Sequence, residues 1–508
     1  MQNYLIYCQL VTFLPYNLKI NEQKDRFSLK QLLTSPETVI RAAILFICMF
    51  NASLLGLPYF GDHVTLISIP ASDYYNSGFH SIWLPEGHAT GHPPFYALLT
   101  ALSWAIFGKS LVISHLLTLI FSLVLIAQYA RLTKQMAEPR MRSLALILLL
   151  ANPVFLAQMA AMSIDVFLTA VFLWGINVIH TRKKLFLIVA CILLTISSLR
   201  GFMLVTILFL YDWLYHKYAV KQLTINILYY LIACIPITVY FIFQYQHSGW
   251  WLVPTDGNWS EGRQLTDKTT ILPKLFEFGL RFIEFGLLIP MVVVIFYYLK
   301  NYQTYRFNHK FVLILIGISV FAVFIIPFQN SVLIRYLLPI QLLVLLLFCE
   351  MVMDFKNGIL RKAAIGLTLI MMIAQHFVAY PETKSSAWAY NWGDGSLAHL
   401  SYFTFRTACH DYVVANKIPD DSIYAGFPDY KPFEYTDLNN DTIAYSSSDL
   451  SCSKYIILSN VMNNIPYCEK EQIRTQATEV KRWSRYPVEY VLYENTNLHN
   501  KYNDEVCK

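Results

Sequence analysis

The segment HATGHPPFYALLTALSWAIFG, residues 88–108, decides how the rest of the chain is interpreted. Two prolines follow a polar loop, and an apolar run that ends at Gly108 comes directly after them. Because proline suits the first turn of a helix, the segment predicts a helix of about four turns. Such a helix is too short to cross a bilayer, which takes about 20 apolar residues. The sequence therefore predicts a short apolar helix, residues 93–108, with a polar loop in front of it.

The composition of the whole chain is that of a polytopic membrane protein. Its 508 residues are 56% hydrophobic and 14% charged, whereas soluble domains carry about 25% charged residues. The mean hydropathy is +0.43. The net charge of +6 is accounted for by basic loops on one side of a membrane, so we expect no nucleic-acid partner.

Apolar segments separated by polar loops predict a mainly α fold, a bundle of about eleven transmembrane helices. Basic residues gather in every second connection, and by the positive-inside rule these connections face the cytoplasm. The odd number of spans then puts the C-terminal part outside. The predicted spans are 41–61, 111–130, 143–160, 164–179, 185–199, 202–215, 223–243, 281–299, 311–328, 334–353 and 363–380.

Three regions follow from this topology. Residues 1–40 form a cytoplasmic N-terminal segment, and residues 41–383 form the transmembrane domain, with long outer loops at 62–110 and 244–280. From residue 384 to residue 508 the chain is polar, and its alternating runs KYIILS and VEYVLYE are typical of strands. We expect a small extracytoplasmic α/β domain there.

The cysteines agree with this sidedness. The predicted extracytoplasmic domain holds an even number of them, Cys409, Cys452, Cys468 and Cys507. An even number outside the cytoplasm favours disulfides, whose pairing the sequence leaves open, over free thiols.

Three charged residues lie at the outer edges of predicted spans, where charges are costly. Asp165 begins the fourth span, Arg200 lies between the fifth and sixth, and Arg335 begins the tenth. Arginines in short outer turns run against the positive-inside bias, which suggests a bound anion. The alternatives are arginines that reach the interface, or an ion pair with Asp165 that only ties helices together.

The first outer loop adds further candidates. Asp73 is flanked by apolar and aromatic residues and could serve as a general base, or it could be an ordinary solvated carboxylate. Glu86, His88 and His92 crowd the same loop, and such side chains can bind a metal. Their spacing matches no known metal-binding signature, so the sequence assigns no cofactor. A divalent metal at these side chains is possible.

These motifs together resemble the GT-C class of membrane glycosyltransferases. The resemblance is strongest to the branch of protein O-mannosyltransferases and lipid A aminoarabinose transferases. It rests on the order of SDYYNSGFHSIWLPEGHATGHPPFYALLTALSWAIFG, NPVFLAQMAAMSIDVFLTAVFLWG, SLRGFMLV and RYLLP, over about residues 41–345. In this family the helix after the Pro-Pro pair lies along the membrane surface, which implies that role for residues 93–108.

The resemblance implies a polyprenyl-phosphate sugar as donor and an acceptor hydroxyl on a glycan, lipid or protein, with membrane lipid as surroundings. Asp73 and Asp165 are then the candidate catalytic residues, with Asp73 taking the proton in an inverting transfer. The candidate substrate-binding residues are Arg200, Arg335, Tyr336, His92 and Tyr74. The family branch also implies a multi-pass protein of the plasma (inner) membrane, with active site and C-terminus extracytoplasmic.

The chain departs from the family in its first loop. Family members often carry an Asp-Glu pair where this chain has Asp73-Tyr74, and the interval from Asp73 to Pro93 is shorter. Rival interpretations are a transporter, a ligase or flippase for lipid-linked glycans, and an assembly protein that acts through its tail. A transporter is disfavoured because the charges lie at the outer edge and no internal repeat is visible.

Overall fold

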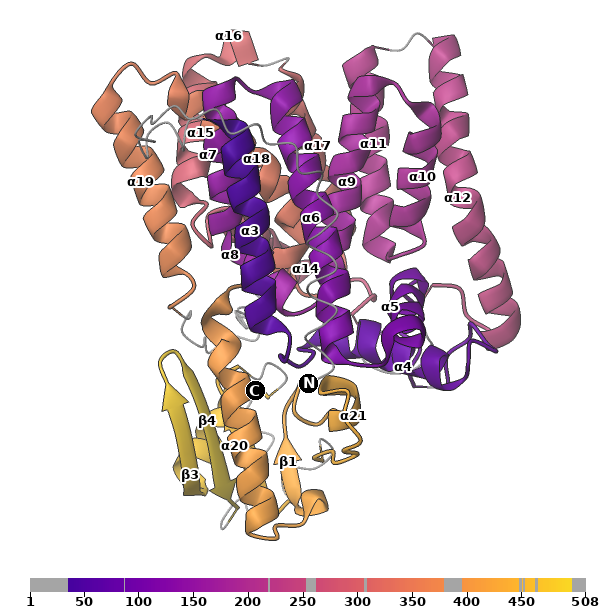
Figure 1. The fold of residues 1–508 in the computed structure, drawn as a ribbon, viewed down its shortest axis with the longest axis vertical. Helices are drawn as coiled ribbons and strands as arrows, with labels where there is room; N and C mark the ends of the chain where they lie inside the picture. The colour runs from indigo at the N-terminus through magenta and orange to yellow at the C-terminus, as the bar shows by residue number, and fades with distance from the viewer. Residues whose placement is uncertain are drawn as a thin grey trace, which may run out of the picture.

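The computed structural model describes residues 35–85, 87–217, 220–252, 262–305, 308–378, 395–446, 450, 453–461 and 465–495. A bundle of helices occupies most of this range, and a smaller lobe of residues 395–495 lies at one end of it (Figure 1). The bundle helices are α3 (Pro36–Leu54), α6 (Leu111–Met136), α7 (Pro139–Ala151), α8 (Pro153–Ala160), α9 (Ile164–Thr181), α10 (Lys184–Thr195), α11 (Leu199–His216), α12 (Val220–Ser248), α15 (Leu288–Lys300), α17 (His309–Ile325), α18 (Leu338–Met353) and α19 (Gly358–Ala374).

Each predicted span overlaps a helix or a pair of helices, so the predicted helical bundle is confirmed. Five helices are long and apolar enough to cross a membrane alone, and the pair α7–α8 makes a sixth if it is one span. This pair is bent by 50° at the Asn152–Pro153 junction, where the Asn152 side chain caps α8 through the Phe155 amide. The chain is a multi-pass membrane protein. Of the five long helices, α9 and the helical segment Ile334–Met353, which includes α18, are the most buried.

The predicted surface helix is α5 (Phe95–Phe107), and its existence is confirmed. One face, formed by Tyr96, Ala97, Thr100, Ala101 and Trp104, is buried against the bundle. The Trp104 indole donates a hydrogen bond of 2.9 Å to Ser114 at the start of α6. The opposite face leaves large apolar side chains exposed, as expected for a helix lying at a lipid surface: Leu102, Ile106 and Phe107.

Two further features of the outer loops were not predicted. The first loop begins with a π-helix, η3 (Val64–Ser68), that continues into α4 (Ile69–Asn76). The predicted outer connection 244–280 contains a helix, α14 (Lys268–Leu280), that the sequence analysis did not expect. Pro273 lies in the second turn of α14, where it removes a single backbone hydrogen bond.

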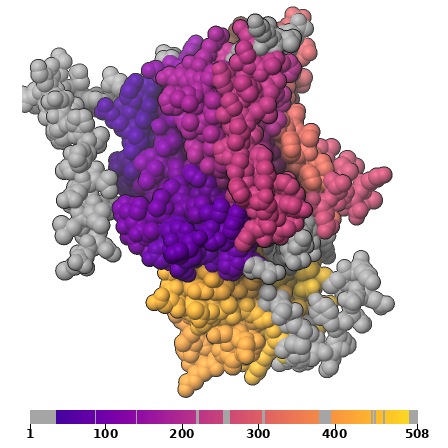
Figure 2. All heavy atoms as spheres, turned by 90° about the vertical axis from the view of Figure 1, so that its right-hand side faces the viewer, coloured from indigo at the N-terminus to yellow at the C-terminus, as the bar shows by residue number. Residues whose placement is uncertain are grey.

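The C-terminal lobe is a small mixed α/β unit, as predicted. Its sheet has the order β1-β2-β4-β3, with β1 and β2 parallel and the other pairs antiparallel. The lobe lies directly below the first outer loop, which Figure 2 shows as orange and yellow atoms under indigo and violet ones. Its elements are η6 (Leu397–Leu400), α20 (Ser401–Ala415), β1 (Ile423–Ala425), α21 (Phe433–Thr436), β2 (Tyr455–Ser459), α22 (Tyr467–Gln476), β3 (Thr478–Arg485) and β4 (Val488–Glu494).

The predicted disulfides are confirmed in one place and wrong in another. Cys468 is disulfide-bonded. Cys409 is a free thiol buried in α20, where it packs as a small apolar side chain. Cys452 and Cys507 lie outside the described residues.

Candidate active site

Four charged side chains meet at the end of the bundle that faces the C-terminal lobe. Arg200 donates a hydrogen bond to Asp165, and Arg335 donates one to Asp62. The Arg335 Nε atom lies 3.5 Å from the second oxygen of Asp165, so the four residues form one continuous chain of ion pairs. The structure thus brings together Asp165, Arg200 and Arg335, and adds Asp62, which the sequence interpretation did not single out.

The local sequence explains how these side chains are presented. Asp165 and Arg200 each lie in the first turn of a helix, α9 and α11, and each helix is capped by a serine. The Ser163 hydroxyl also donates to Asp165 Oδ2, at 3.1 Å. Arg335 lies in η4 (Ile334–Leu337), a short 3-10 helix that leads into α18. Asp165, Arg200 and Arg335 are therefore fixed to helix ends rather than to flexible loops.

The two carboxylates differ in exposure. The Asp62 side chain is 32% exposed, whereas the Asp165 side chain is 4% exposed. Asp165 is occupied by Ser163 and two arginines. Asp62 is the carboxylate that an incoming molecule can reach.

Tyr336 packs between the two arginines. Its ring centroid lies 4.2 Å from the Arg200 guanidinium carbon and 5.4 Å from that of Arg335. Both distances are within the range of cation–π attraction. Tyr336, a candidate substrate-binding residue of the sequence analysis, therefore contacts both guanidinium groups of the cluster.

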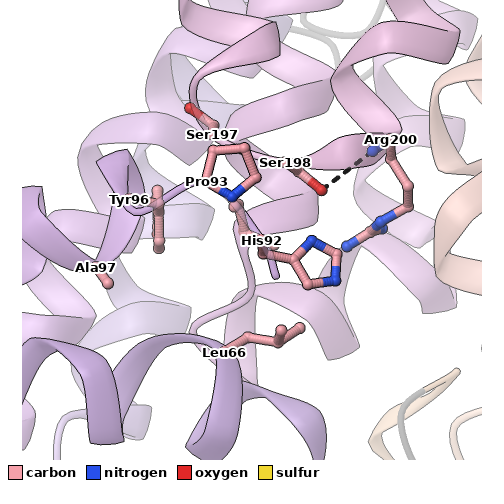
Figure 3. Close-up of a pocket in the computed structure, with 9 residues that line it drawn as sticks. Leu66, His92, Pro93, Tyr96, Ala97, Ser197, Ser198 and Arg200 are labelled. Carbon is pink, nitrogen blue, oxygen red and sulfur yellow. Dashed lines mark hydrogen bonds between the residues drawn. The ribbon is translucent and has the colours of Figure 1, made fainter. Parts of the chain in front are cut away.

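A pocket opens beside Arg200 (Figure 3). Its apolar lining is formed by Leu66, Pro93, Tyr96, Ala97 and Ile164. Its polar lining is formed by His92, Ser197, Ser198 and Arg200. The N-terminus of α11 begins there, and a helix N-terminus favours anions. The pocket lining thus combines a cation and a helix N-terminus with apolar side chains.

Close contact between two helix ends holds Arg200 in this place. A Cβ atom on Gly201 would lie 1.8 Å from the Leu194 carbonyl oxygen at the end of α10. No side chain fits there, so glycine at position 201 allows the start of α11 to approach α10.

His92 faces Arg200 across the pocket (Figure 3). Burial, together with the positive charges of Arg263 and Arg200, keeps the pKa of His92 well below its usual range. A neutral imidazole beside two arginines offers a hydrogen-bond donor or acceptor without further charge. His92 therefore lies in the site in which the sequence placed it.

Arg263 is a cation that the sequence interpretation missed. It donates hydrogen bonds to the Leu252 carbonyl and, at 2.8 Å, to the Thr90 carbonyl. Burial lowers its pKa to about 10, so it remains charged near neutral pH. Through these bonds the second outer loop brings a cation to the first loop, beside His92.

Asp73 and Tyr74 lie elsewhere. Asp73 Oδ2 and His88 Nδ1 form a hydrogen bond of 2.8 Å. The centroid of the His88 ring lies 6.1 Å from that of Tyr435 in the C-terminal lobe. Tyr74 is 1% exposed and donates its hydroxyl hydrogen to the Ile82 carbonyl. In this arrangement Tyr74 is a core residue of the first loop, and Asp73 is paired with a histidine rather than with an arginine.

The structure tests the possible metal site only in part. Within the described ranges, no three His, Cys, Asp or Glu side chains are grouped so that they could hold a metal ion. Glu86, one of the residues considered, lies outside those ranges. His88 and His92 have different neighbours, Asp73 for the first and the Arg200 pocket for the second.

The architecture defines the class of fold. No protein-family model and no curated protein sequence matches the chain. The helical bundle, the surface helix and the small C-terminal sheet together form the fold of the GT-C membrane glycosyltransferases.

Two solved structures share this fold, both of ArnT from Cupriavidus metallidurans. ArnT bound to undecaprenyl phosphate superimposes with a TM-score of 0.53 at 11% sequence identity, covering 91% of this chain and 99% of ArnT. ArnT in the apo state gives a TM-score of 0.53 at 12% identity, covering 90% and 97%. Identities this low show a common fold alone.

Proposed function

We propose that this protein is a membrane glycosyltransferase that moves a sugar from a polyprenyl-phosphate donor to an acceptor hydroxyl. One observation carries the proposal: the pocket lining combines apolar side chains with Arg200, and a chain of ion pairs connects Arg200 to the partly exposed carboxylate of Asp62. A lipid phosphate has the same two-part chemistry. The fold adds support, because ArnT, which shares it, has been solved with bound undecaprenyl phosphate.

The donor phosphate would be held by Arg200, Arg263 and His92. Guanidinium groups bind phosphate with two parallel hydrogen bonds, and the N-terminus of α11 adds its partial positive charge. The isoprenoid chain would leave along Leu66, Tyr96 and Ala97 toward the lipid. Tyr336 keeps Arg200 oriented when the pocket is empty.

The acceptor hydroxyl would be activated by Asp62 rather than by Asp73. Asp62 is exposed enough to meet it and lies in the same ion-pair chain as Arg200. The acceptor oxygen forms a bond to the anomeric carbon while the bond from that carbon to the phosphate oxygen breaks. The proton of the hydroxyl passes to Asp62, and polyprenyl phosphate leaves with the bonding electrons.

Charge develops on the departing phosphate in this reaction. Cations that are already in place stabilise that charge without reorganisation, which is commonly the largest contribution to catalysis. A single displacement of this kind inverts the configuration at the anomeric carbon. The sugar and the acceptor, whether glycan, lipid or protein, are left to experiment.

The reaction would take place on the outer side of the plasma membrane. Basic connections such as α6–α7 and α9–α10 lie at the end of the bundle away from the C-terminal lobe (Figure 1). By the positive-inside rule that end is cytoplasmic, so the pocket and the lobe would be extracytoplasmic.

Binding of undecaprenyl phosphate tests this proposal directly. The purified chain in nanodiscs is titrated with undecaprenyl phosphate and examined by native mass spectrometry, beside Arg263→Gln and Arg482→Gln. Arg482 is an exposed arginine on β3 that pairs with Glu479 and Glu489, so it serves as a matched control.

We expect specific binding by the wild type and by Arg482→Gln, and at least about tenfold weaker binding by Arg263→Gln, the factor for one hydrogen-bonded ion contact. A panel of synthetic undecaprenyl-phosphate sugars, offered with membrane extract as acceptor, then identifies the donor. A wild type that binds undecaprenyl phosphate no better than bulk phospholipid would contradict the proposal and favour a transporter.

A further inference from the structure

Phe60, two residues before Asp62, is part of the core of the C-terminal lobe. It is 5% exposed and belongs to the hydrophobic cluster that includes β2 and β4 rather than to that of the bundle. Its ring stacks on His399 at 4.8 Å and meets Tyr402 and Phe403 edge-on at 5.5 and 5.7 Å. The loop that carries Asp62 is therefore inserted into the lobe.

A second part of the C-terminal lobe also contacts the loop that carries Asp62. Residues 427–437, which we call the bridging segment, lie alongside that loop. The Tyr59 amide donates to the Thr436 carbonyl at 2.8 Å, and the Ser68 hydroxyl donates to the Tyr435 carbonyl at 2.5 Å. One bond lies before Asp62 in the sequence and the other lies after it.

The centre of the loop is in close contact as well. The Phe427 ring lies 4.0 Å from where a Cβ atom on Gly61 would stand, and Gly61 has a left-handed φ of +57°. Burial and the Asp62 carboxylate together raise the pKa of Tyr430 in the bridging segment.

The bridging segment is itself anchored inside the lobe. Asp429 is 2% exposed and accepts hydrogen bonds from the Tyr402 hydroxyl and, at 2.9 Å, from the Tyr490 hydroxyl. Arg406 donates to both oxygens of Asp437, at 2.6 and 2.5 Å. Side chains of α20 and β4 thus fix the segment whose backbone holds the Asp62 loop.

We propose that the C-terminal lobe is the positioning element of the active site, and that Phe60 is the residue through which it holds Asp62 against Arg335. The proposal rests on the proposed function only where it gives Asp62 a catalytic role. Phe60 touches no reacting atom, so it is a positioning residue.

Carboxyl footprinting of the full chain in nanodiscs tests this inference without substrate. The carboxyl groups are coupled to glycine ethyl ester, and the extent of modification of Asp62 is measured by mass spectrometry. Phe60→Ala is compared with Leu458→Ala, which removes a side chain of 3% exposure from the same core but outside the Asp62 loop.

Phe60→Ala is expected to raise modification of Asp62 severalfold, because the carboxylate leaves Arg335, while Leu458→Ala leaves it unchanged. Both variants lower the melting temperature of the lobe. Phe60→Leu, which keeps most of the apolar volume, should give an intermediate result and serves if Phe60→Ala fails to fold. Equal modification in Phe60→Ala and wild type, or an equal rise in Leu458→Ala, would overturn the inference.

Binding of undecaprenyl phosphate by Phe60→Leu separates this inference from the proposed function. Arg200 lines the pocket and is held by Asp165, and Arg263 is held at Thr90 by the outer loops, so binding should stay at the wild-type level. Loss of binding in parallel with Asp62 modification would mean that the lobe stabilises the whole protein, which also overturns the inference. A wild type that binds no undecaprenyl phosphate leaves the footprinting result valid.

Discussion

Arg335 is hydrogen-bonded to Asp62, although 273 residues of chain separate them. Arg335 enters the site from the start of η4, and Asp62 enters it from the loop that follows α3. The pairing leaves Asp62 partly exposed and Arg335 fully enclosed, at 32% and 2% of their side-chain surfaces. One partner can therefore meet a substrate, and the other maintains its position.

Matched substitutions of Asp62 and Asp73 test which of the two carboxylates is the general base. Asp62→Asn should lower sugar transfer about 100- to 10,000-fold, the usual contribution of a general base. Asp73→Asn loses only the hydrogen bond to His88 and should lower it less than about tenfold. The measurement is the initial rate of transfer from the undecaprenyl-phosphate sugar that the wild type uses. The reverse order of effects would restore Asp73 as the base that the sequence alone suggested.

Arg335→Gln should destabilise the protein before it affects binding. The substitution leaves the buried Asp165 and its neighbour Asp62 without their shared cation, and breaking a buried pair costs about 3–5 kcal/mol. The melting temperature in detergent measures this loss. Arg482→Gln, on the exposed surface of β3, should shift the melting temperature little, because exposed pairs are worth about 1 kcal/mol or less. Similar shifts in both variants would contradict the arrangement of charges described above.

Gly201→Ala should weaken donor binding through the backbone. The new Cβ would meet the Leu194 carbonyl oxygen, so α11 must move away from α10 and take Arg200 with it. We expect a loss of about 1–3 kcal/mol in stability, typical of overpacking, and weaker binding of undecaprenyl phosphate. Gly366→Ala in α19, where a Cβ meets open space, is the matched control and should be neutral or slightly stabilising. Unchanged binding in Gly201→Ala would show that the start of α11 is not part of the donor site.

The stability of the C-terminal lobe should depend on pH through Asp429. Burial raises the pKa of this carboxyl group from 3.8 to about 6 in the folded state. The folded state therefore binds the proton more tightly than the unfolded state. This contribution to stability is complete below about pH 4, is lost as the pH rises through 6, and amounts to about 3 kcal/mol.

Asp429→Asn has no group to titrate at this position, so it should remove this part of the pH dependence. Melting temperatures of the full chain from pH 4 to pH 8 make the comparison. Because other carboxyl groups titrate in both proteins, the quantity of interest is the difference between the two curves. Parallel curves would mean that Asp429 titrates alike in the folded and unfolded chains.

Much of the fold was predictable because it follows from local patterns. Uninterrupted apolar runs predicted the bundle, the Pro-Pro pair predicted the start of α5, and alternation in residues 488–494 predicted β4. α14 escaped prediction because its proline and its polar start are typical of a loop. Cys409 escaped because nothing in the sequence distinguishes a buried thiol from a bonded one.

The candidate site was only half predictable. Asp165, Arg200 and Arg335 were found because a charge at the edge of an apolar span is conspicuous. Asp62 was missed although it follows α3 more closely than Asp73, because its partner lies far along the chain. Arg263 was missed because the second outer loop contains several polar residues and no local pattern marks the one that reaches Thr90.

The insertion of Phe60 into the C-terminal core affects how the lobe can be handled as a unit. A fragment that begins at residue 395 would carry a hole the size of a phenyl ring, because that ring comes from residue 60. Residues 57–60 are thus a missing piece of the lobe rather than a linker to it. Exchange of this lobe between related proteins will need to carry those residues along, or chimeras will begin with an unfilled core.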